Sequence, residues 1–269
     1  MQPFLFLFGV HQLIFSTLRR ILSTQLFMKK IFLAFAALAV VCSCNKEDHG
    51  DANLHITGTV KGLSQGTLYI QRVVDTTLVA MDTIVIKGKS DFESHLKIDS
   101  PEMLYLFLDR GQTNSIDNNL PFFAEPGNMR IETANEEFFS KAKITGSKNQ
   151  KLYEDFLKLK SRFTGQNAEL IKKNLEGSMK GNVAQLDSVS LEQEKLLKRR
   201  YLFTVNFALN HAKHDVGPYL ALSEIYDANI KYLDTIAKAM SPQVAKAHYG
   251  KMLTKYIAER KKAQAEEVK

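Results

Sequence analysis

Three patterns of hydrophobic and polar residues follow one another along this 269-residue chain. Residues 1–43 contain apolar runs interrupted by a few bases. From Leu54 to Thr145, apolar and polar residues alternate with a period of two, which is typical of strands with one face in a core. After Ser147, apolar residues recur every three or four positions, as in amphipathic helices. The pattern predicts an α+β fold: an antiparallel β-rich domain over residues 54–146, then an α-helical bundle over residues 147–269.

Turn residues divide the alternating region into consecutive antiparallel strands. The run Met103–Leu108 is almost continuously apolar, so we expect both faces of that strand to be covered. Residues 109–119 form the longest polar stretch and predict a loop that is either an ordinary connection or a functional site. The expected strands cover residues 54–60, 68–74, 77–86, 92–98, 103–108, 122–124 and 129–133.

The helical half begins with a capping signal. Ser147 and Gln150 form a capping box, in which serine accepts a hydrogen bond from the N3 amide and glutamine reaches back. We expect this first helix to end at Gly165, and a second helical pattern that begins at Asn167 to fade at Gly177 and Gly181.

Three further helices are predicted after Gly181. The helix over residues 186–210 is expected to be the spine of this half. Pro218 suits the first turn of the next helix, whose core face is expected to include Tyr219, Leu222, Ile225 and Tyr226. The last helix is expected over residues 242–257, and the polar tail after residue 259 is expected to fray.

Residues 28–48 indicate export. Two lysines, an apolar run from Ile31 to Val41 and a small residue before Cys44 are typical of a signal peptide. The sequence Val-Cys-Ser-Cys at residues 41–44 resembles a bacterial lipobox, in which the cysteine after the cleavage site is lipidated. We therefore expect residues 1–43 to be an upstream extension and signal peptide, with Met28 as the initiator, and residues 44–53 to be a tether. Residues 1–27 are alternatively a long n-region or an amphipathic membrane-surface helix.

This signal predicts an outer-membrane lipoprotein that is held to the membrane by acyl chains on Cys44. The tether carries Lys46, Glu47 and Asp48, which resemble the lysine-plus-acidic export signal of Bacteroidetes surface lipoproteins. Surface display follows if these residues act as that signal. The alternative is an ordinary charged tether, with the protein facing the periplasm.

Charge argues against a nucleic-acid partner. The formal net charge is +7, but four of the 36 bases and none of the 29 acids precede Cys44, which leaves +3. Residues 44–150 carry −4 and residues 151–269 carry +7. Because the bases alternate with glutamates along predicted helices, we expect a solvated helical surface and no nucleic-acid binding.

Candidate chemistry is sparse. The only cysteines are Cys42 and Cys44, so the predicted mature chain has no thiol redox centre and no disulfide. His211, His214 and Asp215 offer ligands to a metal, but histidines near a helix C-terminus also complement the helix dipole, and we favour that interpretation. No nucleophile elbow or phosphate-binding loop occurs, so no metal and no cofactor are expected.

Aromatic residues in the β-rich region are candidates for a ligand groove, with Tyr69, Tyr105 and Phe122 as its selected residues. The simpler interpretation is that they belong to the core, and a third is that they form a protein-binding face. The full set is Tyr69, Phe92, Tyr105, Phe107, Phe122 and Phe123.

The chain resembles a known family in four places: the lipobox, Ile-Thr-Gly-Thr-Val at residues 56–60, Phe-Phe-Ala-Glu-Pro-Gly at 122–127 and Ile-Thr-Gly-Ser at 144–147. These look like the N-terminal domain of unknown function on Bacteroidetes thioredoxin-like (thiol-disulfide interchange) lipoproteins, and the resemblance extends from Leu54 to about Lys262. That family often continues into a thioredoxin domain with a Cys-x-x-Cys motif, which this chain lacks. The resemblance implies the architecture and an envelope location, and no redox residue.

We therefore expect a non-catalytic binding or scaffold module with an envelope protein as partner, accessory to thiol-redox or uptake systems by analogy. One alternative is a cofactor-free hydrolase with its site in the 109–119 loop. It requires a polar cluster in a cleft beside that loop, whereas a binding module would show an apolar or aromatic patch there. Another alternative is a truncated relic of the thioredoxin-bearing form.

Overall fold

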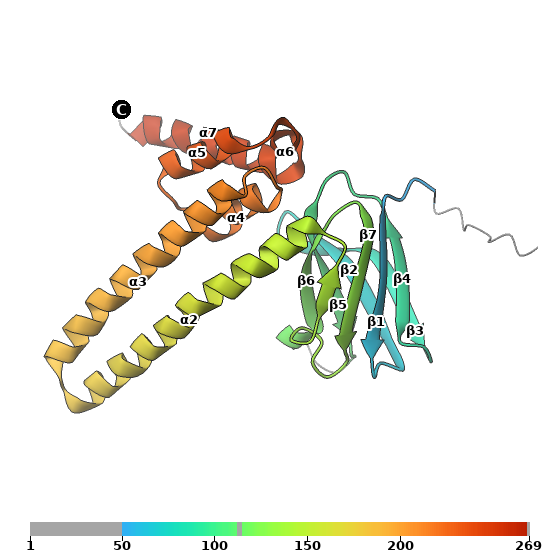
Figure 1. Ribbon diagram of the computed structural model, residues 1–269, viewed down its shortest axis with the longest axis horizontal. Helices are drawn as coiled ribbons and strands as arrows, with labels where there is room; N and C mark the ends of the chain where they lie inside the picture. The colour runs from blue at the N-terminus through green and yellow to red at the C-terminus, as the bar shows by residue number, and fades with distance from the viewer. Residues whose placement is uncertain (1–49, 112–114, 268–269) are drawn as a thin grey trace, which may run out of the picture. The chain divides into compact units, whose positions relative to one another are not determined.

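The computed structural model describes residues 50–111 and 115–267, and from Gly50 onward the chain forms one compact unit. Strands come first and helices follow, which confirms the predicted α+β class (Figure 1). The change from strand to helix falls at Ser147, the N-cap of the first described helix. The predicted lipidation site, Cys44, and the predicted export signal, Lys46, Glu47 and Asp48, lie outside the described residues.

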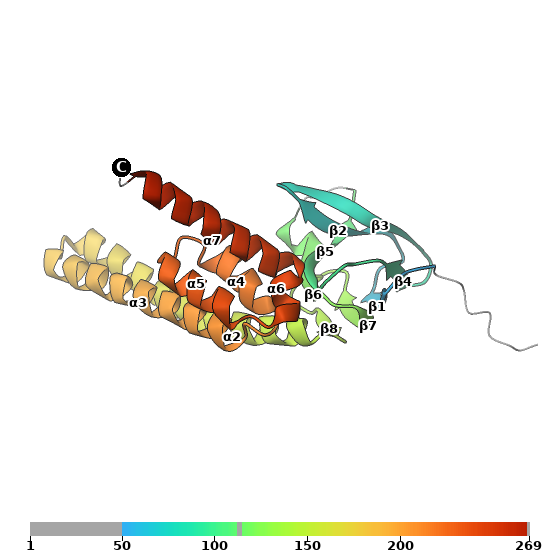
Figure 2. The ribbon, with the colours of Figure 1, turned by 90° about the horizontal axis from the view of Figure 1, so that it is seen from above.

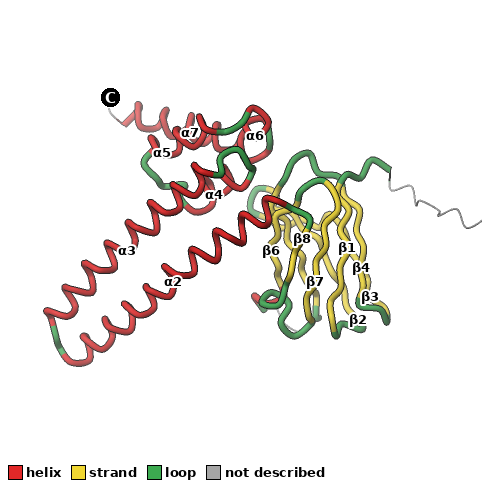
Figure 3. Tube along the Cα trace, in the orientation of Figure 1, coloured by secondary structure: helices red, strands yellow, loops and turns green. Residues whose placement is uncertain are grey.

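The strands form a sandwich of two four-stranded sheets (Figure 3). The β1 sheet has the order β4-β1-β7-β8, and the β2 sheet has the order β3-β2-β5-β6. The strands are β1 (Leu54–Lys61), β2 (Gln65–Val74), β3 (Thr77–Lys87), β4 (Asp91–Leu96), β5 (Glu102–Asp109), β6 (Asn119–Ala124), β7 (Gly127–Ala134) and β8 (Lys143–Thr145).

One pairing differs from the expected run of antiparallel strands. β1 pairs in parallel with β7, with Leu54 opposite Gly127, whereas the other strand pairs are antiparallel. The chain crosses repeatedly between the two sheets, so β1 gains a neighbour that lies far along the sequence. Alternation along a strand reveals which face is buried, but it does not reveal the direction of the neighbouring strand.

The core of the sandwich consists of the apolar residues that face inward from both sheets. Leu54, Ile56 and Val60 of β1 are fully buried, as are Leu68 and Ile70 of β2. The prediction that both faces of β5 are covered is confirmed. Its even-numbered leucines, Leu104, Leu106 and Leu108, face this core, while Met103 and Tyr105 pack against the helical core.

The helices form a long hairpin and a compact group at its base (Figures 1 and 2). The hairpin consists of α2 and α3, which pack side by side and extend away from the β-sandwich. No helix in residues 50–111 and 115–267 is both long and apolar enough to cross a membrane. The helices are α2 (Lys148–Lys180), α3 (Val183–Asn210), α4 (Val216–Glu224), α5 (Ile230–Ala239), α6 (Pro242–Lys246) and α7 (His248–Glu267).

The predicted break at Gly165 is wrong, because α2 continues from Lys148 to Lys180 without interruption. A helical glycine costs only about 1 kcal/mol relative to alanine, and packing along α3 offsets that cost. The helix ends at Gly181, one of the two glycines at which the second pattern was expected to fade, and its φ of 61° is the left-handed conformation that favours glycine in a C-cap.

Two predictions for the C-terminal helices are also wrong. Tyr226 lies beyond the end of α4 and is 58% exposed, because the chain leaves the helix at Ile225 and helical spacing no longer applies. The polar tail does not fray within the described residues, since α7 continues to Glu267. Arg260 Nη1 donates hydrogen bonds to the carbonyls of Tyr226 and Ala228, at 2.9 and 2.7 Å, which holds this part of α7 against the α4–α5 loop.

Gly146 makes the connection from β8 to α2. Its φ is 98°, which lies in the region that favours glycine. A Cβ at this position would lie 2.8 Å from Met129 Cα and would overlap the carbonyl oxygen of Asn128. The tight approach of this turn to β7 fixes the point at which α2 begins.

Candidate functional site

A pocket of about 530 Å³ lies where the sandwich meets the helices. The loop before β5 and the turn between β6 and β7 contribute one side, and the turn before α4 together with α6 contributes the other. We call this the junction pocket. Its lining residues are Asp99, Ser100, Pro101, Glu125, Pro126, Asp215, Gln243, Lys246 and Ala247.

Glu125 lies at the N-terminus of α2. Its Oε2 accepts hydrogen bonds from Ser147 Oγ at 2.9 Å and from the amides of Lys148 and Asn149 at 2.9 and 3.1 Å. The first amides of a helix have no partner within the helix, and the helix dipole favours a negative charge there. This carboxylate therefore ties the β6–β7 turn to the start of α2.

The capping box is only half confirmed. Ser147 Oγ accepts a hydrogen bond from the Gln150 amide at 2.9 Å, as predicted for the N-cap. The Gln150 side chain does not reach back, because its Oε1 accepts from the Phe123 amide at 2.7 Å and its Nε2 donates to Glu154. The spacing of Ser147 and Gln150 predicted where the helix begins, but it did not predict that the Gln150 side chain binds the backbone of β6.

The first turn of α2 connects three elements. Besides the contact of Gln150 with β6, Asn149 Oδ1 accepts a hydrogen bond from the Val216 amide at 3.0 Å. Asn149 and Gln150 are both buried. A buried backbone amide without a partner is costly, so these two side chains are required where β6 and α4 meet α2.

Aromatic rings fill the contact between the β2 sheet and the helices. Phe123 of β6 meets Tyr219 of α4 and Tyr249 of α7 edge to face, with centroid separations of 5.5 and 6.0 Å. The Met103 amide donates a hydrogen bond to the Tyr249 hydroxyl at 2.9 Å. Burial raises the pKa of both tyrosines well above the usual value, so both stay neutral.

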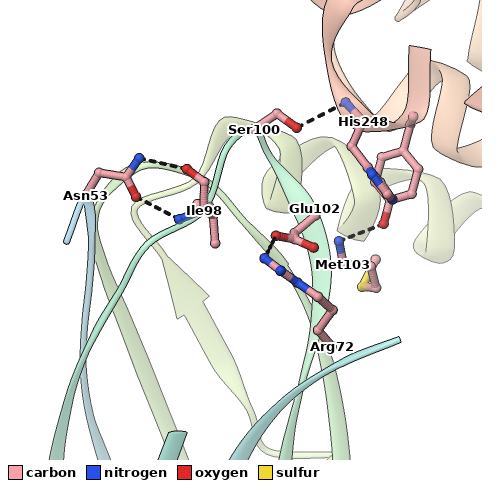
Figure 4. A network of polar contacts seen from close by, with 8 residues as sticks. Asn53, Arg72, Ile98, Ser100, Glu102, Met103 and His248 are labelled. Atoms are coloured by element: carbon pink, nitrogen blue, oxygen red, sulfur yellow. Dashed lines mark hydrogen bonds and ion pairs between the residues drawn. The ribbon is translucent and has the colours of Figure 1, made fainter. Parts of the chain in front are cut away.

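Polar contacts around the start of β5 continue this connection (Figure 4). The backbone amide of His248 donates to Ser100 Oγ at 3.1 Å, which ties the start of α7 to the loop before β5. Arg72 and Glu102 form an ion pair at 2.5 Å between β2 and β5. The Ser100 contact joins the sandwich to the helices, whereas the ion pair stabilises the β2–β5 pairing within the sheet.

Asp215 is the exceptional group in the junction pocket. Its side chain lines the pocket and is 8% exposed, and its Oδ1 has no hydrogen-bond partner among the described residues. Burial raises the pKa of this carboxyl, the hydrogen bond from its own backbone amide partly opposes the rise, and the negative charge of Glu125 adds to it, so that the pKa lies at about 6. Asp215 therefore changes charge near pH 6 at the point where α3 turns into α4.

We predict that Asp215→Asn stabilises the protein at pH 7.5 but not at pH 4. The raised pKa means that the folded state holds the proton more tightly than the unfolded chain, so the wild type loses stability as the pH rises from about 4 through 6. The shift corresponds to about 2 to 3 kcal/mol of unfolding free energy. Urea unfolding at both pH values measures this difference, and an equal effect of the substitution at pH 4 and 7.5 would contradict it.

The structure does not bring the predicted histidines into a metal centre. His211 follows α3 with its ring against Phe207, at a centroid separation of 4.4 Å. Burial lowers the pKa of His211 and of His214. No group of three or more His, Cys, Asp or Glu side chains is arranged to hold a metal ion in the part of the chain that the structure describes.

The three selected groove residues do not face a common groove. Phe122 is fully buried and faces the core of the sandwich, while Tyr105 lies on the opposite face of the same sheet and packs against the helices. Tyr69, half-buried on β2, contacts Phe107 at a centroid separation of 6.3 Å. Successive side chains of a strand point to opposite faces of the sheet. Phe122 pairs with Leu104 and Tyr105 pairs with Pro121, so Phe122 and Tyr105 lie on opposite faces.

The described part of the 109–119 loop lies at the other end of β5 from the junction pocket. Asp117 accepts hydrogen bonds from the amides of Phe138 and Phe139 at 3.2 and 3.1 Å, and lies 3.5 Å from Arg110. These polar groups hold the loop to the segment before β8. Ile116 is almost fully exposed beside them.

Sequence reasoning missed the junction pocket. Consecutive buried residues in β6, Phe122 and Phe123, were the available signal, because both faces of a strand are covered only when something packs on the outer side. Nothing local in the sequence indicates that Glu125 reaches α2 or that Asp215 is buried. Both facts depend on contacts between segments far apart in the chain.

Comparison with known proteins finds one similarity. Residues 54–153 match the model of the family described as Domain of unknown function (DUF4369). The predicted resemblance to an N-terminal domain of unknown function is confirmed, and its association with thioredoxin domains stays a prediction. The match includes β1 to β8 and the first turn of α2, with Glu125, Asn149 and Gln150. No curated protein and no solved structure matches the chain.

Proposed function

We propose that this chain is an envelope-anchored lipoprotein that acts as a non-catalytic binding module, with the distal part of the α2–α3 hairpin as the surface for a protein partner. We call residues 163–197 of this hairpin the arm. One observation carries the proposal: the arm exposes large apolar side chains along most of its length. Most large apolar side chains of the sandwich and of the hairpin base are buried, and the exceptions in the sandwich, such as Val73, Val79 and Val85, lie on β2 and β3.

The arm has a small core. Only Leu170, Val189 and Leu196 form its buried cluster, with Phe163 packed against them. Ile171, Leu175 and Met179 follow one another at four-residue spacing along α2 and are 55%, 61% and 80% exposed. Exposed apolar side chains at such spacing are typical of a surface that another protein covers. Further exposed apolar residues of the arm are Val183, Leu191 and Leu197.

The free edge of the β2 sheet is a weaker candidate for partner binding. β3 is the edge strand, and its pairing with β2 is interrupted by a bulge between Ile70 and Gln71. Asp82 points inward beside the bulge and accepts a hydrogen bond from Ser94 Oγ at 2.5 Å. Bulges and inward-pointing charges prevent strand addition at sheet edges. This favours the arm over β3.

The envelope location rests on the sequence of residues 28–48. Each buried methylene of an acyl chain contributes about 0.8 kcal/mol, and a single chain gives only marginal binding, so multiple acyl chains on Cys44 would hold the protein firmly. By analogy with the lipoproteins that the sequence resembles, thiol-redox and uptake complexes are the first class of partner to test.

The alternative of a cofactor-free hydrolase receives less support from the geometry. The Asp117 carboxylate already accepts two backbone hydrogen bonds, and Arg110 donates to the Asn135 carbonyl. Both side chains therefore have structural partners that explain their presence. An acid or base catalyst in this loop would have to give up those contacts.

We predict that replacing exposed apolar residues of the arm with charged ones abolishes partner binding. Leu175→Asp combined with Met179→Asp should lower recovery of a cross-linked envelope partner at least tenfold, because both side chains are exposed and neither supports the core. In vivo photo-crosslinking from residue 171, followed by purification with the anchor intact, measures this recovery. Val85→Asp on β3 is the matched control, since Val85 is 57% exposed, and it should retain the partner. Equal loss in both variants, or no adduct from wild type, would contradict the proposal.

We predict that Cys44→Ala releases the protein from membranes and abolishes incorporation of a labelled fatty acid. The substitution removes the thiol that is proposed to carry the acyl chains, while the rest of the signal remains. Cell fractionation with fatty-acid labelling tests this. Cys42→Ala is the matched control and should leave both lipid labelling and membrane association intact. Membrane association that survives Cys44→Ala would refute the lipidation site.

A further inference from the structure

The junction pocket contains a negative charge that the fold leaves without a cation. Asp215 lines this pocket and is 8% exposed, so its carboxylate is largely removed from water. Its Oδ1 has no hydrogen-bond partner among the described residues, and the hydrogen bond from its own backbone amide compensates only part of the cost of burial. Because a buried charge is costly unless it is paired, a cation beside Asp215 would stabilise the ionised form.

The other charges that line the pocket leave it negative. Asp99 and Glu125 contribute two further carboxylates, and Lys246 is the single base of the lining. Glu125 uses its Oε2 to cap α2, but its negative charge still acts on Asp215. Lys246 is exposed and forms no ion pair with these acids among the described residues. His214 adds little positive charge at pH 7.5, because burial lowers its pKa.

The size of the pocket and the spread of its carboxylates favour an organic cation over a metal ion. The volume of about 530 Å³ lies within the range of about 300 to 1,000 Å³ for small-molecule pockets. A metal ion requires ligands that converge on one point. No group of three or more His, Cys, Asp or Glu side chains converges in this way within residues 50–111 and 115–267. An ammonium group offers three hydrogen-bond donors to carboxylates, which only accept when ionised.

We infer that the junction pocket binds a small organic cation whose ammonium group pairs with the Asp215 carboxylate. The charges of Glu125 and Asp99 add to the attraction, whereas that of Lys246 opposes it. The pairing neutralises a carboxylate that is ionised at pH 7.5 and that the described residues leave without a base. A charge-assisted hydrogen bond in such a shielded place is stronger than one between neutral groups.

The rest of the lining suits the carbon chain of such a cation. Pro101, Pro126 and Ala247 contribute apolar surface beside the acids. A few charged groups among apolar ones are typical of small-molecule sites, in which the charged groups orient the ligand. The pocket lies at the base of the helices and shares no residue with the arm, residues 163–197. The inference is therefore independent of the proposed function.

Calorimetric titration of the full chain with putrescine at pH 7.5 tests the site. We expect binding of one equivalent and a raised unfolding temperature. Butanediol, in which hydroxyls replace both ammonium groups, should not bind. Asp215→Asn should weaken putrescine binding at least about tenfold, because it removes one partner of a buried charge pair. Lys246→Ala should tighten binding, because it removes the base of the lining.

Variants outside the pocket provide the controls. Asp187→Asn removes the same charge from an exposed position on the arm and should bind putrescine as the wild type does. The arm variant Leu175→Asp with Met179→Asp should also bind normally, so that failure of the arm proposal and failure of this inference are distinguishable. Circular dichroism checks that each variant is folded.

Four results would overturn the inference. They are no binding of putrescine to the wild type, equal binding of butanediol, the same loss in Asp215→Asn and Asp187→Asn, and displacement of putrescine by an equal concentration of Mg²⁺. The third would indicate attraction to the whole surface, and the fourth would indicate a metal site.

Discussion

The rest of the structure depends on the hydrogen bonds that the first turn of α2 makes to its neighbours. Gln150 accepts from the amide of Phe123 in β6, and Asn149 accepts from the amide of Val216 in α4. Both contacts are buried, where an unpaired amide costs about 1 to 3 kcal/mol. Glu125 also fixes this turn, because its carboxylate accepts hydrogen bonds from the backbone amides of Lys148 and Asn149. The strand region and the helices are joined through these side chains.

Two features follow from this junction. Because the base of α2 is fixed, the arm, which we propose as the surface for a partner, has a defined direction relative to the sandwich (Figure 1). The same junction buries Asp215 beside Glu125, which is why its pKa rises toward neutrality. The proposed partner surface and the titrating Asp215 therefore lie in separate parts of the molecule, the distal arm and the junction pocket.

Local sequence signals predicted the elements better than their connections. The alternation of residues 54–60 and the burial of 103–108 on both faces were correct, and Ser147 was correctly identified as a helix N-cap. The uninterrupted α2 was missed because packing along α3 outweighs the local cost of Gly165. The parallel pairing of β1 with β7 and the role of Gln150 were missed for one reason. Each depends on residues that are 27 to about 70 positions apart, whose register only the folded chain sets.

The central claim is that the sandwich and the helices unfold together because of the junction. Urea unfolding of the chain tests this most directly, with two probes compared over the same urea series: circular dichroism at 222 nm for the helices and hydrogen exchange at backbone amides of the sandwich core. A single cooperative unit requires both signals to change at the same urea concentration. The account predicts coincident transitions in the wild type. Well-separated transitions, with helices lost while the strand amides of Ile56 and Leu106 stay protected, would contradict it.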